Sequence, residues 1–272
     1  MKFAQNLLRP FAYLTSNRFG QALLKKGLKL IQYLMGAGAG GDIRTSGEKA
    51  ILPLVKDHSS AQYIIFDVGA NRGQFLSLVL STFGKTGNFL VHAFEPSKFT
   101  FDILSRDFQR FEGIQLNNFA LGQEKGTLTL YYPFEGTGYA SLTQRNMSHL
   151  NLEFGMSEDC VVDTIDTYCE RMRIPTINLL KIDVEGHEFE VLCGAKGLFE
   201  SGKIDFCTFE FGSACIDTRI SFKDFYYFFQ KYRMKVYRIT PSGYLNEITI
   251  YNEIDEIYRD TNFLAAKTEM MP

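Results

Sequence analysis

Tyr-Ile-Ile-Phe-Asp-Val-Gly-Ala-Asn-Arg-Gly, residues 63–73, combines a strand, a turn and the start of a helix. Residues 63–66 are β-branched or aromatic, which is typical of a strand buried on both faces. Asp67 is expected to end that strand. After Gly73, apolar residues recur at helical spacing, at Phe75, Leu76, Val79 and Leu80. A glycine turn here lets a ligand approach backbone N–H groups and the positive end of the helix.

The glycine pattern of this turn indicates which ligand it suits. Dinucleotide-binding turns carry G-x-G-x-x-G and hold the pyrophosphate at the helix N-terminus. Here the pattern is D-x-G-x-N-x-G, with Asn71 in place of the middle glycine. Asp67 would repel a phosphate but suits a cation, such as the α-ammonium of S-adenosylmethionine. We therefore predict Asp67 and Gly69 at the methionine end of that cofactor, with Asn71 and Gly73 shaping the turn. An ordinary tight turn is the alternative.

A second acidic residue, Glu95, follows the next predicted strand, residues 91–94, and precedes Pro96. An acidic residue about 20 positions beyond the glycine turn is placed to accept hydrogen bonds from both ribose hydroxyls of a nucleoside. Asn118 ends the third predicted strand and is predicted to offer its amide to an adenine, although Asn is also a common turn residue. An NAD-dependent oxidoreductase of Rossmann type is the alternative, disfavoured by Asp67 and Asn71.

Three ionisable residues, Asp183, Glu185 and His187, follow a further buried strand at residues 177–182. In open α/β sheets the ligand crevice lies at the carboxyl ends of the strands, and an acid beside an imidazole allows proton removal from a hydroxyl. We predict these three as the catalytic residues, with Glu210 as a weaker candidate; for His187 alone the alternative is a surface position at a helix start. A divalent cation held by Asp183 and Glu210 is possible chemistry, but no dense ligand cluster is visible, so a metal-free site is predicted.

Composition excludes several classes of protein. The net charge of −2 gives no overall basic field, which argues against a nucleic-acid partner. The five cysteines are scattered and contain no C-x-x-C pair. They fit buried, reduced thiols of a cytoplasmic protein better than a disulfide framework or a zinc site.

Residues 1–41 differ from the rest of the chain, because they are basic and contain no Asp or Glu. The apolar side chains of residues 23–35 form a broad face opposite a polar strip, Gln21, Lys25, Lys29 and Gln32. The apolar runs are too short for a transmembrane helix or a secretory signal. A helix packing on the domain or on a second subunit is one interpretation, and a basic amphipathic helix on the inner face of an anionic membrane is the other. Residues 36–41 are predicted to be a flexible Gly/Ala linker to a domain spanning 42–272.

The segment 123–176 interrupts the alternation of strands and helices. Strands are expected at 127–132 and 160–165, and a helix at 168–172 capped by Asp166 or Thr167. We predict an insertion that is a lid for the methyl acceptor, a strand pair that extends the sheet, or both. Elsewhere, helices are expected at 48–56 (interrupted near Pro53), 99–111 and 222–232, and strands at 114–118, 206–211, 236–239 and 262–267.

Four motifs in this order resemble the FkbM family of S-adenosylmethionine-dependent methyltransferases: Ile65–Gly73, Phe94–Pro96, Asn118–Gly122 and Leu180–Glu188. The resemblance runs from about Ile64 to about Glu210. It implies an α/β, Rossmann-like class I methyltransferase fold, with a seven-stranded, mostly parallel sheet and helices on both faces. It also implies O-methylation of a small-molecule or glycan hydroxyl, on a natural product or a bacterial polysaccharide or glycolipid sugar. A catalytically silent nucleoside-binding module is the remaining alternative.

Overall fold

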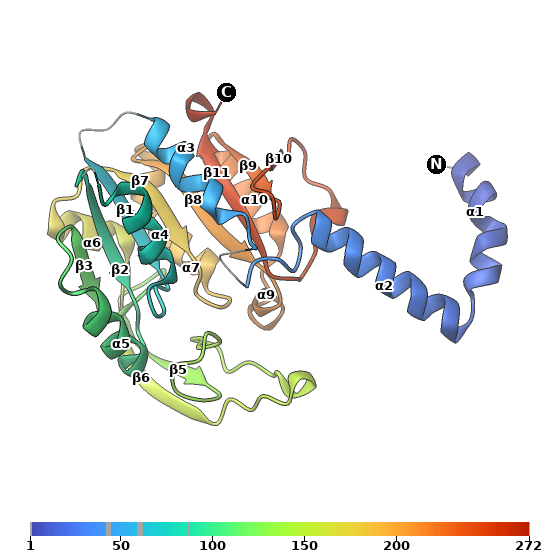
Figure 1. The fold of residues 1–272 in the computed structure, drawn as a ribbon, viewed down its shortest axis with the longest axis horizontal. Helices are drawn as coiled ribbons and strands as arrows, with labels where there is room; N and C mark the ends of the chain where they lie inside the picture. Colours follow the sequence, from blue (N-terminus) through green and yellow to red (C-terminus); the bar gives the residue numbers. More distant parts are fainter. Residues whose placement is uncertain (1, 42–44, 59–61, 86, 272) are drawn as a thin grey trace.

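A central sheet of eight strands organises the molecule (Figure 1). The structure is a computed structural model that describes residues 2–41, 45–58, 62–85 and 87–271. The strands of this sheet are β1 (Tyr63–Val68), β2 (Phe89–Phe94), β3 (Ile114–Asn117), β7 (Ile177–Ile182), β8 (Ile204–Phe211), β9 (Met234–Ile239), β10 (Leu245–Glu247) and β11 (Thr261–Lys267). Their order is β10-β9-β11-β8-β7-β1-β2-β3, and the run from β8 to β3 is parallel.

Helices cover both faces of the sheet because successive strand residues point to opposite sides. In β1, Phe66 and Val68 belong to a core formed with α6 (Ile165–Met172), α7 (Glu188–Cys193), α8 (Lys196–Glu200) and α10 (Phe222–Lys231). Tyr63 and Ile65 belong to the opposite core, formed with α3 (Ile51–Asp57), α4 (Gln74–Phe83) and α5 (Lys98–Phe108). The two-faced burial expected for the first strand is therefore confirmed.

Four details of the main domain differ from the sequence predictions. The sheet has eight strands rather than seven, because the three-residue β10 pairs antiparallel with β9 at the edge. Asp67 lies inside β1 and does not end it. Pro53 does not interrupt its helix, since it lies in the first turn of α3, where a missing N–H costs no hydrogen bond. The helix α6 begins at Ile165 and is capped by the Thr164 side chain, which accepts from the Thr167 N–H.

The insertion forms a sheet of its own. This sheet contains β5 (Gly126–Tyr132) and β6 (Met156–Asp163) of the insertion together with β4 (Ala120–Leu121), which directly precedes it, in the order β4-β6-β5. Figure 1 shows this layer apart from the central sheet. Among the described residues these strands do not extend the main sheet, and β6 is longer than the strand expected at 160–165. The insertion is thus positioned to cover a site rather than to widen the sheet.

The N-terminal helices α1 (Lys2–Thr15) and α2 (Arg18–Leu34) project from the body as an arm (Figure 1). The predicted linker after them packs closely on the domain: the N–H groups of Gly38 and Gly40 each donate to the Asp260 carbonyl at 2.9 Å, and Ala37 is fully buried. No helix in the described part of the chain is long and apolar enough to cross a membrane. Elsewhere in the described part of the chain, the short helix α9 (Ala214–Thr218) follows β8.

Candidate active site

A cavity of about 850 Å³ lies where the ends of β1, β2, β7 and β8 face the insertion. Its volume falls within the range of small-molecule sites. Among its walls are Gly69 and Asn71 after β1, Glu95 after β2, and Glu210 near the end of β8. Residues 134–142 of the insertion close the opposite side. The sheet and the insertion therefore enclose a single chamber, as expected at the carboxyl ends of parallel strands.

The turn after β1 is held in a conformation that only glycine fits at its first position. Gly69 has φ +83, and a Cβ atom there would lie 1.8 Å from the Asp183 carbonyl oxygen. Gly73 also has positive φ, and a Cβ there would lie 2.2 Å from the Phe108 ring, so this glycine serves packing and does not line the cavity. The two glycines thus bring the β1 turn against the end of β7 and against α5.

Glu95 is a buried carboxylate in the cavity wall, and its side chain is tied to the β1 turn. It accepts hydrogen bonds from the N–H groups of Asn71 and Ser97, each at 2.9 Å. Burial raises the pKa of Glu95 to about 7, although those two donors oppose the shift. Near neutral pH this group therefore exchanges between a carboxylate and a neutral acid, and only the carboxylate accepts two further hydrogen bonds from hydroxyls.

Asp67 occupies a different place from the one predicted for it. It is fully buried and is not among the described residues that line the cavity. In the β1–β7 register it lies opposite Lys181, whose Nζ is 3.4 Å from Asp67 Oδ1 and 3.2 Å from Asp183 Oδ2. Burial raises the pKa of Asp67, and Lys181 opposes that shift. Lys181 lines the cavity and Asp67 does not, so any influence of Asp67 on a ligand there would pass through Lys181.

Asn118 also lies behind the wall rather than in it. Its Nδ2 donates to the backbone carbonyls of Glu95, at 2.9 Å, and Pro96, at 3.1 Å. Both hydrogen bonds fix the turn that carries Glu95. Instead, Phe119 and Leu121 line the cavity beyond β3, which gives that end an apolar surface suited to a flat heterocycle.

The turn after β7 carries the acidic and imidazole groups into the cavity. Asp183, Glu185 and His187 all line it, as predicted. Glu185 has φ +56, a conformation that non-glycine residues seldom adopt. Glu188 stabilises this turn, because its carboxylate accepts hydrogen bonds from the N–H groups of Val184, at 2.9 Å, and Gly186, at 3.0 Å.

Three residues of the insertion, at every second position from 141 to 145, form hydrogen bonds with this turn. Ser141 Oγ donates to the Glu185 carbonyl at 2.7 Å, and Arg145 Nη1 donates to Glu185 Oε2 at 2.5 Å. Thr143 Oγ1 lies 2.9 Å from His187 Nε2. Burial lowers the pKa of His187, which leaves the imidazole neutral and able to accept a proton. The insertion therefore positions the imidazole, a link that we did not predict.

Comparison with known protein families identifies the fold that carries this site. The family model described as "Methyltransferase FkbM domain" matches residues 67–256. This is most of the chain and includes every motif that we singled out except the first residues of β1. The chain belongs to the FkbM methyltransferase family. It therefore carries a methyltransferase domain whose cofactor is S-adenosylmethionine, and not an NAD-dependent oxidoreductase of the same sheet type.

Individual relatives are more distant. The chain is 30% identical over 159 residues to Hexuronic acid methyltransferase AglP of Haloferax volcanii, covering 57% of this chain and 59% of that protein. It is 28% identical over 145 residues to Methyltransferase 1 of Beauveria bassiana, covering 48% and 57%. The chain thus spans less than two thirds of these relatives. The FkbM methyltransferase structure from Methylobacillus flagellatus aligns with a TM-score of 0.46 at 16% identity, covering 76% of this chain and 44% of that one.

The FkbM cavity contains groups that fit S-adenosylmethionine. The buried carboxylate of Glu95 has two oxygens that can accept hydrogen bonds from a pair of ribose hydroxyls. Asn71 Oδ1 is buried and has no hydrogen-bond partner among the described residues, so it is an acceptor available to a ligand. Gly69 leaves the backbone of the turn open to close approach. These features support Gly69, Asn71 and Glu95 as cofactor residues, whereas Asp67, Gly73 and Asn118 would act through their neighbours.

Proposed function

We propose that this protein transfers a methyl group from S-adenosylmethionine to a hydroxyl oxygen of a glycan or natural-product acceptor. One observation carries the proposal: Glu95 after β2 and His187 after β7 line the same cavity. The Glu95 carboxylate can bind the ribose of a nucleoside, and the His187 imidazole can remove a proton from a hydroxyl. An FkbM domain with both groups in one chamber has what O-methylation requires.

The residues of this chain would divide the work between binding and proton transfer. S-Adenosylmethionine, when bound, supplies an electrophilic methyl group. The Glu95 carboxylate accepts hydrogen bonds from the ribose hydroxyls. Asn71, whose N–H donates to Glu95, offers its side-chain oxygen as a further acceptor. His187, oriented by Thr143, accepts the proton of the acceptor hydroxyl during transfer. The insertion excludes water from the chamber, which favours transfer to the acceptor over loss to solvent.

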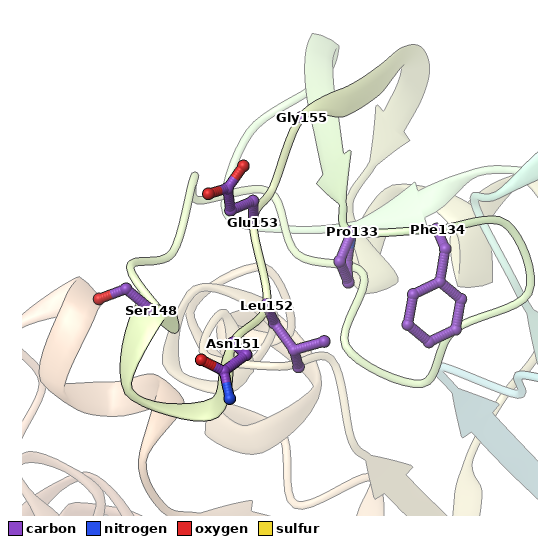
Figure 2. Close-up of a pocket in the computed structure, with 7 residues that line it drawn as sticks. All are labelled: Pro133, Phe134, Ser148, Asn151, Leu152, Glu153 and Gly155. Atoms are coloured by element: carbon purple, nitrogen blue, oxygen red, sulfur yellow. The ribbon is translucent and has the colours of Figure 1, made fainter.

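A sugar acceptor is favoured by the outer part of the insertion. A second pocket of about 570 Å³ is lined by Pro133 and Phe134 after β5 and by residues of the segment before β6 (Figure 2). Phe134 lines both cavities and is half exposed, so its ring is available to a ligand that extends from one to the other. A pocket lined by an aromatic ring and by polar groups such as Asn151 suits a sugar unit. The match to a protein named as a hexuronic acid methyltransferase points the same way.

The proposal is tested by incubating the full chain with methyl-deuterated S-adenosylmethionine and a panel of acceptors. The panel contains free sugars, uronic acids, short oligosaccharides and a macrolide alcohol. We expect a mass increase on a carbohydrate acceptor, with fragmentation placing the methyl group on oxygen. Label on nitrogen or carbon would contradict it, and tight cofactor binding without transfer to any acceptor would support a silent binding module.

We also propose that the N-terminal arm contacts an anionic membrane surface. The apolar face of α2, formed by Phe19, Leu23, Leu30 and Leu34, is at least 61% exposed at each residue. The body holds α2 by its other side, because Arg259 Nη1 donates to Gln32 Oε1 at 3.2 Å and to the Lys29 carbonyl at 3.4 Å. The arm contains no acidic side chain before residue 42. An exposed apolar face flanked by lysines suits an interface with acidic lipids.

Vesicle flotation tests the arm. We expect the protein to float with vesicles containing phosphatidylglycerol, and to release as salt is raised, but not with pure phosphatidylcholine. Leu23→Asp combined with Leu30→Asp should abolish flotation, whereas Ile250→Asp, at a more exposed apolar position on the body, should not. If the wild-type chain ignores anionic vesicles and instead forms a dimer that the same double substitution dissociates, the face is a subunit contact and the proposal fails.

A further inference from the structure

Three carboxylates meet at one corner of the cavity. Oxygen atoms of Asp183, Glu185 and Glu210 all lie within 4.8 Å of one another. The sheet register explains the approach of two of them: β7 and β8 are parallel with Ile182 opposite Phe209, so the next residues, Asp183 and Glu210, are neighbours. The left-handed turn at Glu185 brings the third carboxylate back to the same point.

In two of these carboxylates, only one of the two oxygens contacts a cationic side chain. Asp183 offers Oδ2 to Lys181 at 3.2 Å, and Glu185 offers Oε2 to Arg145 at 2.5 Å. Each therefore retains one oxygen for another partner. Asp67 and Glu48 also compete for Lys181, so the ammonium does not neutralise this corner by itself.

Glu210 differs from the other buried acids of the cavity wall. It is only 9% exposed and lines the cavity, yet it has no hydrogen bond or ion pair among the residues that the structure describes. Glu95 and Glu188, which are similarly buried, each accept two backbone N–H groups. A buried carboxylate is stable when it is paired, bound to a metal ion or protonated, and burial beside Asp183 and the neighbouring acids raises the pKa of Glu210 well above its usual range. A cation bound at this corner of the cavity would stabilise the ionised form of Glu210.

We propose that Asp183, Glu185 and Glu210 bind one divalent cation of the Mg²⁺ or Mn²⁺ type. Hard cations of this size take oxygen ligands, and carboxylates are their usual protein ligands. Three protein ligands leave coordination positions open toward the cavity. This inference deepens the proposed function and rests on it in one respect: acceptor hydroxyl oxygens would fill open positions and so be held near His187. It is an alternative to the metal-free site expected from the sequence.

The cation site is tested with MnCl₂ alone, by electron paramagnetic resonance of the full chain with no methyl donor or acceptor present. We expect one Mn²⁺ per chain that excess Mg²⁺ displaces. Glu210→Gln should weaken Mn²⁺ binding at least tenfold, and Asp183→Asn should do the same. Thermal unfolding of each variant establishes that it is folded. A glutamate of similar burial outside the cluster gives the matched control: Glu95→Gln should bind Mn²⁺ like the wild type.

A parallel titration with S-adenosylmethionine in the presence of EDTA separates the two proposals. We expect the opposite pattern, with cofactor binding weakened at least tenfold in Glu95→Gln and unchanged in Glu210→Gln. Cofactor binding without Mn²⁺ binding, or Mn²⁺ binding that Glu210→Gln leaves unchanged, would overturn the cation site and leave methyl transfer standing. Mn²⁺ binding that needs Glu210, in a chain that binds no cofactor, would uphold the site and overturn the proposed function.

Discussion

Replacement of His187 by alanine is expected to lower kcat by about 10²–10⁴-fold, the usual contribution of a general base. The imidazole lies in the cavity wall, burial keeps it neutral, and Thr143 holds its Nε2. Since it does not contact the proposed nucleoside end, the dissociation constant for S-adenosylmethionine should change little. Stopped-flow or quenched single-turnover measurement on the acceptor, with calorimetry for the cofactor, separates the two effects.

Two companion variants sharpen that result. Thr143→Val removes the hydroxyl that positions the ring but keeps its shape, so we expect a smaller loss of rate in the same direction. His149→Ala, a histidine substitution at an exposed site in the insertion that lines neither cavity, should keep the wild-type rate. Full activity in His187→Ala on the true acceptor would place the base elsewhere.

Glu95→Gln is expected to weaken cofactor binding by about 1.5–3 kcal/mol, the scale of hydrogen bonds to a charged group. The glutamine keeps the size of the side chain and one acceptor oxygen, but it cannot accept from two ribose hydroxyls and from the N–H groups of Asn71 and Ser97 as well. Calorimetric titration with S-adenosylmethionine gives the value directly.

The pH dependence of the same affinity provides an internal check. Burial raises the pKa of Glu95 to about 7 in the free protein, and the cofactor needs the carboxylate form. Affinity should therefore be highest above pH 7 and should fall as pH drops through 7, approaching tenfold for each unit below it. Glu95→Gln should lack this component, whereas Glu158→Gln, a neighbouring acid outside the cavity, should retain it. A wild-type affinity that is flat between pH 5.5 and 7.5 would contradict the assignment.

The positions of the strands along the chain and the residues at their ends were largely predictable, because both depend on short-range patterns. Burial of β1 on two faces, the glycine turn after it and the acid after β2 follow from periodicity and turn chemistry. Seven strands of the sheet were placed correctly, and β10 was missed because three residues at an edge carry no clear pattern. The cavity-lining positions of Gly69, Asn71 and Glu95 follow from the rule for parallel sheets.

Predictions that required knowing which way a side chain points were less successful. Asp67 lies one residue before the end of β1 and in register with Lys181 of β7, so its carboxylate meets Lys181 instead of lining the cavity. A signal for Lys181 was present, since it lies two residues before Asp183 and therefore on the same side of the strand. Asn118 was predicted as an adenine contact, but its amide is used by two backbone carbonyls.

Contacts between distant segments could not be predicted at all. Ser141, Thr143 and Arg145 contact the β7 turn across 40 to 44 positions of sequence, and nothing local to either segment encodes that approach. For Glu210 the sequence indicated Asp183 as a possible partner in binding a cation, but it did not indicate that Glu185 lies beside both of them. The sequence indicated each group as polar and placed it near a strand end; only the assembled sheet brings the groups together.

The most direct test of this account is a crystal structure of the full chain with S-adenosylhomocysteine. We predict electron density in the 850 Å³ cavity, with both ribose hydroxyls within hydrogen-bond distance of the Glu95 carboxylate and the sulfur on the side of His187. A nucleoside bound outside this cavity, or bound in it with its ribose away from Glu95, would contradict the account.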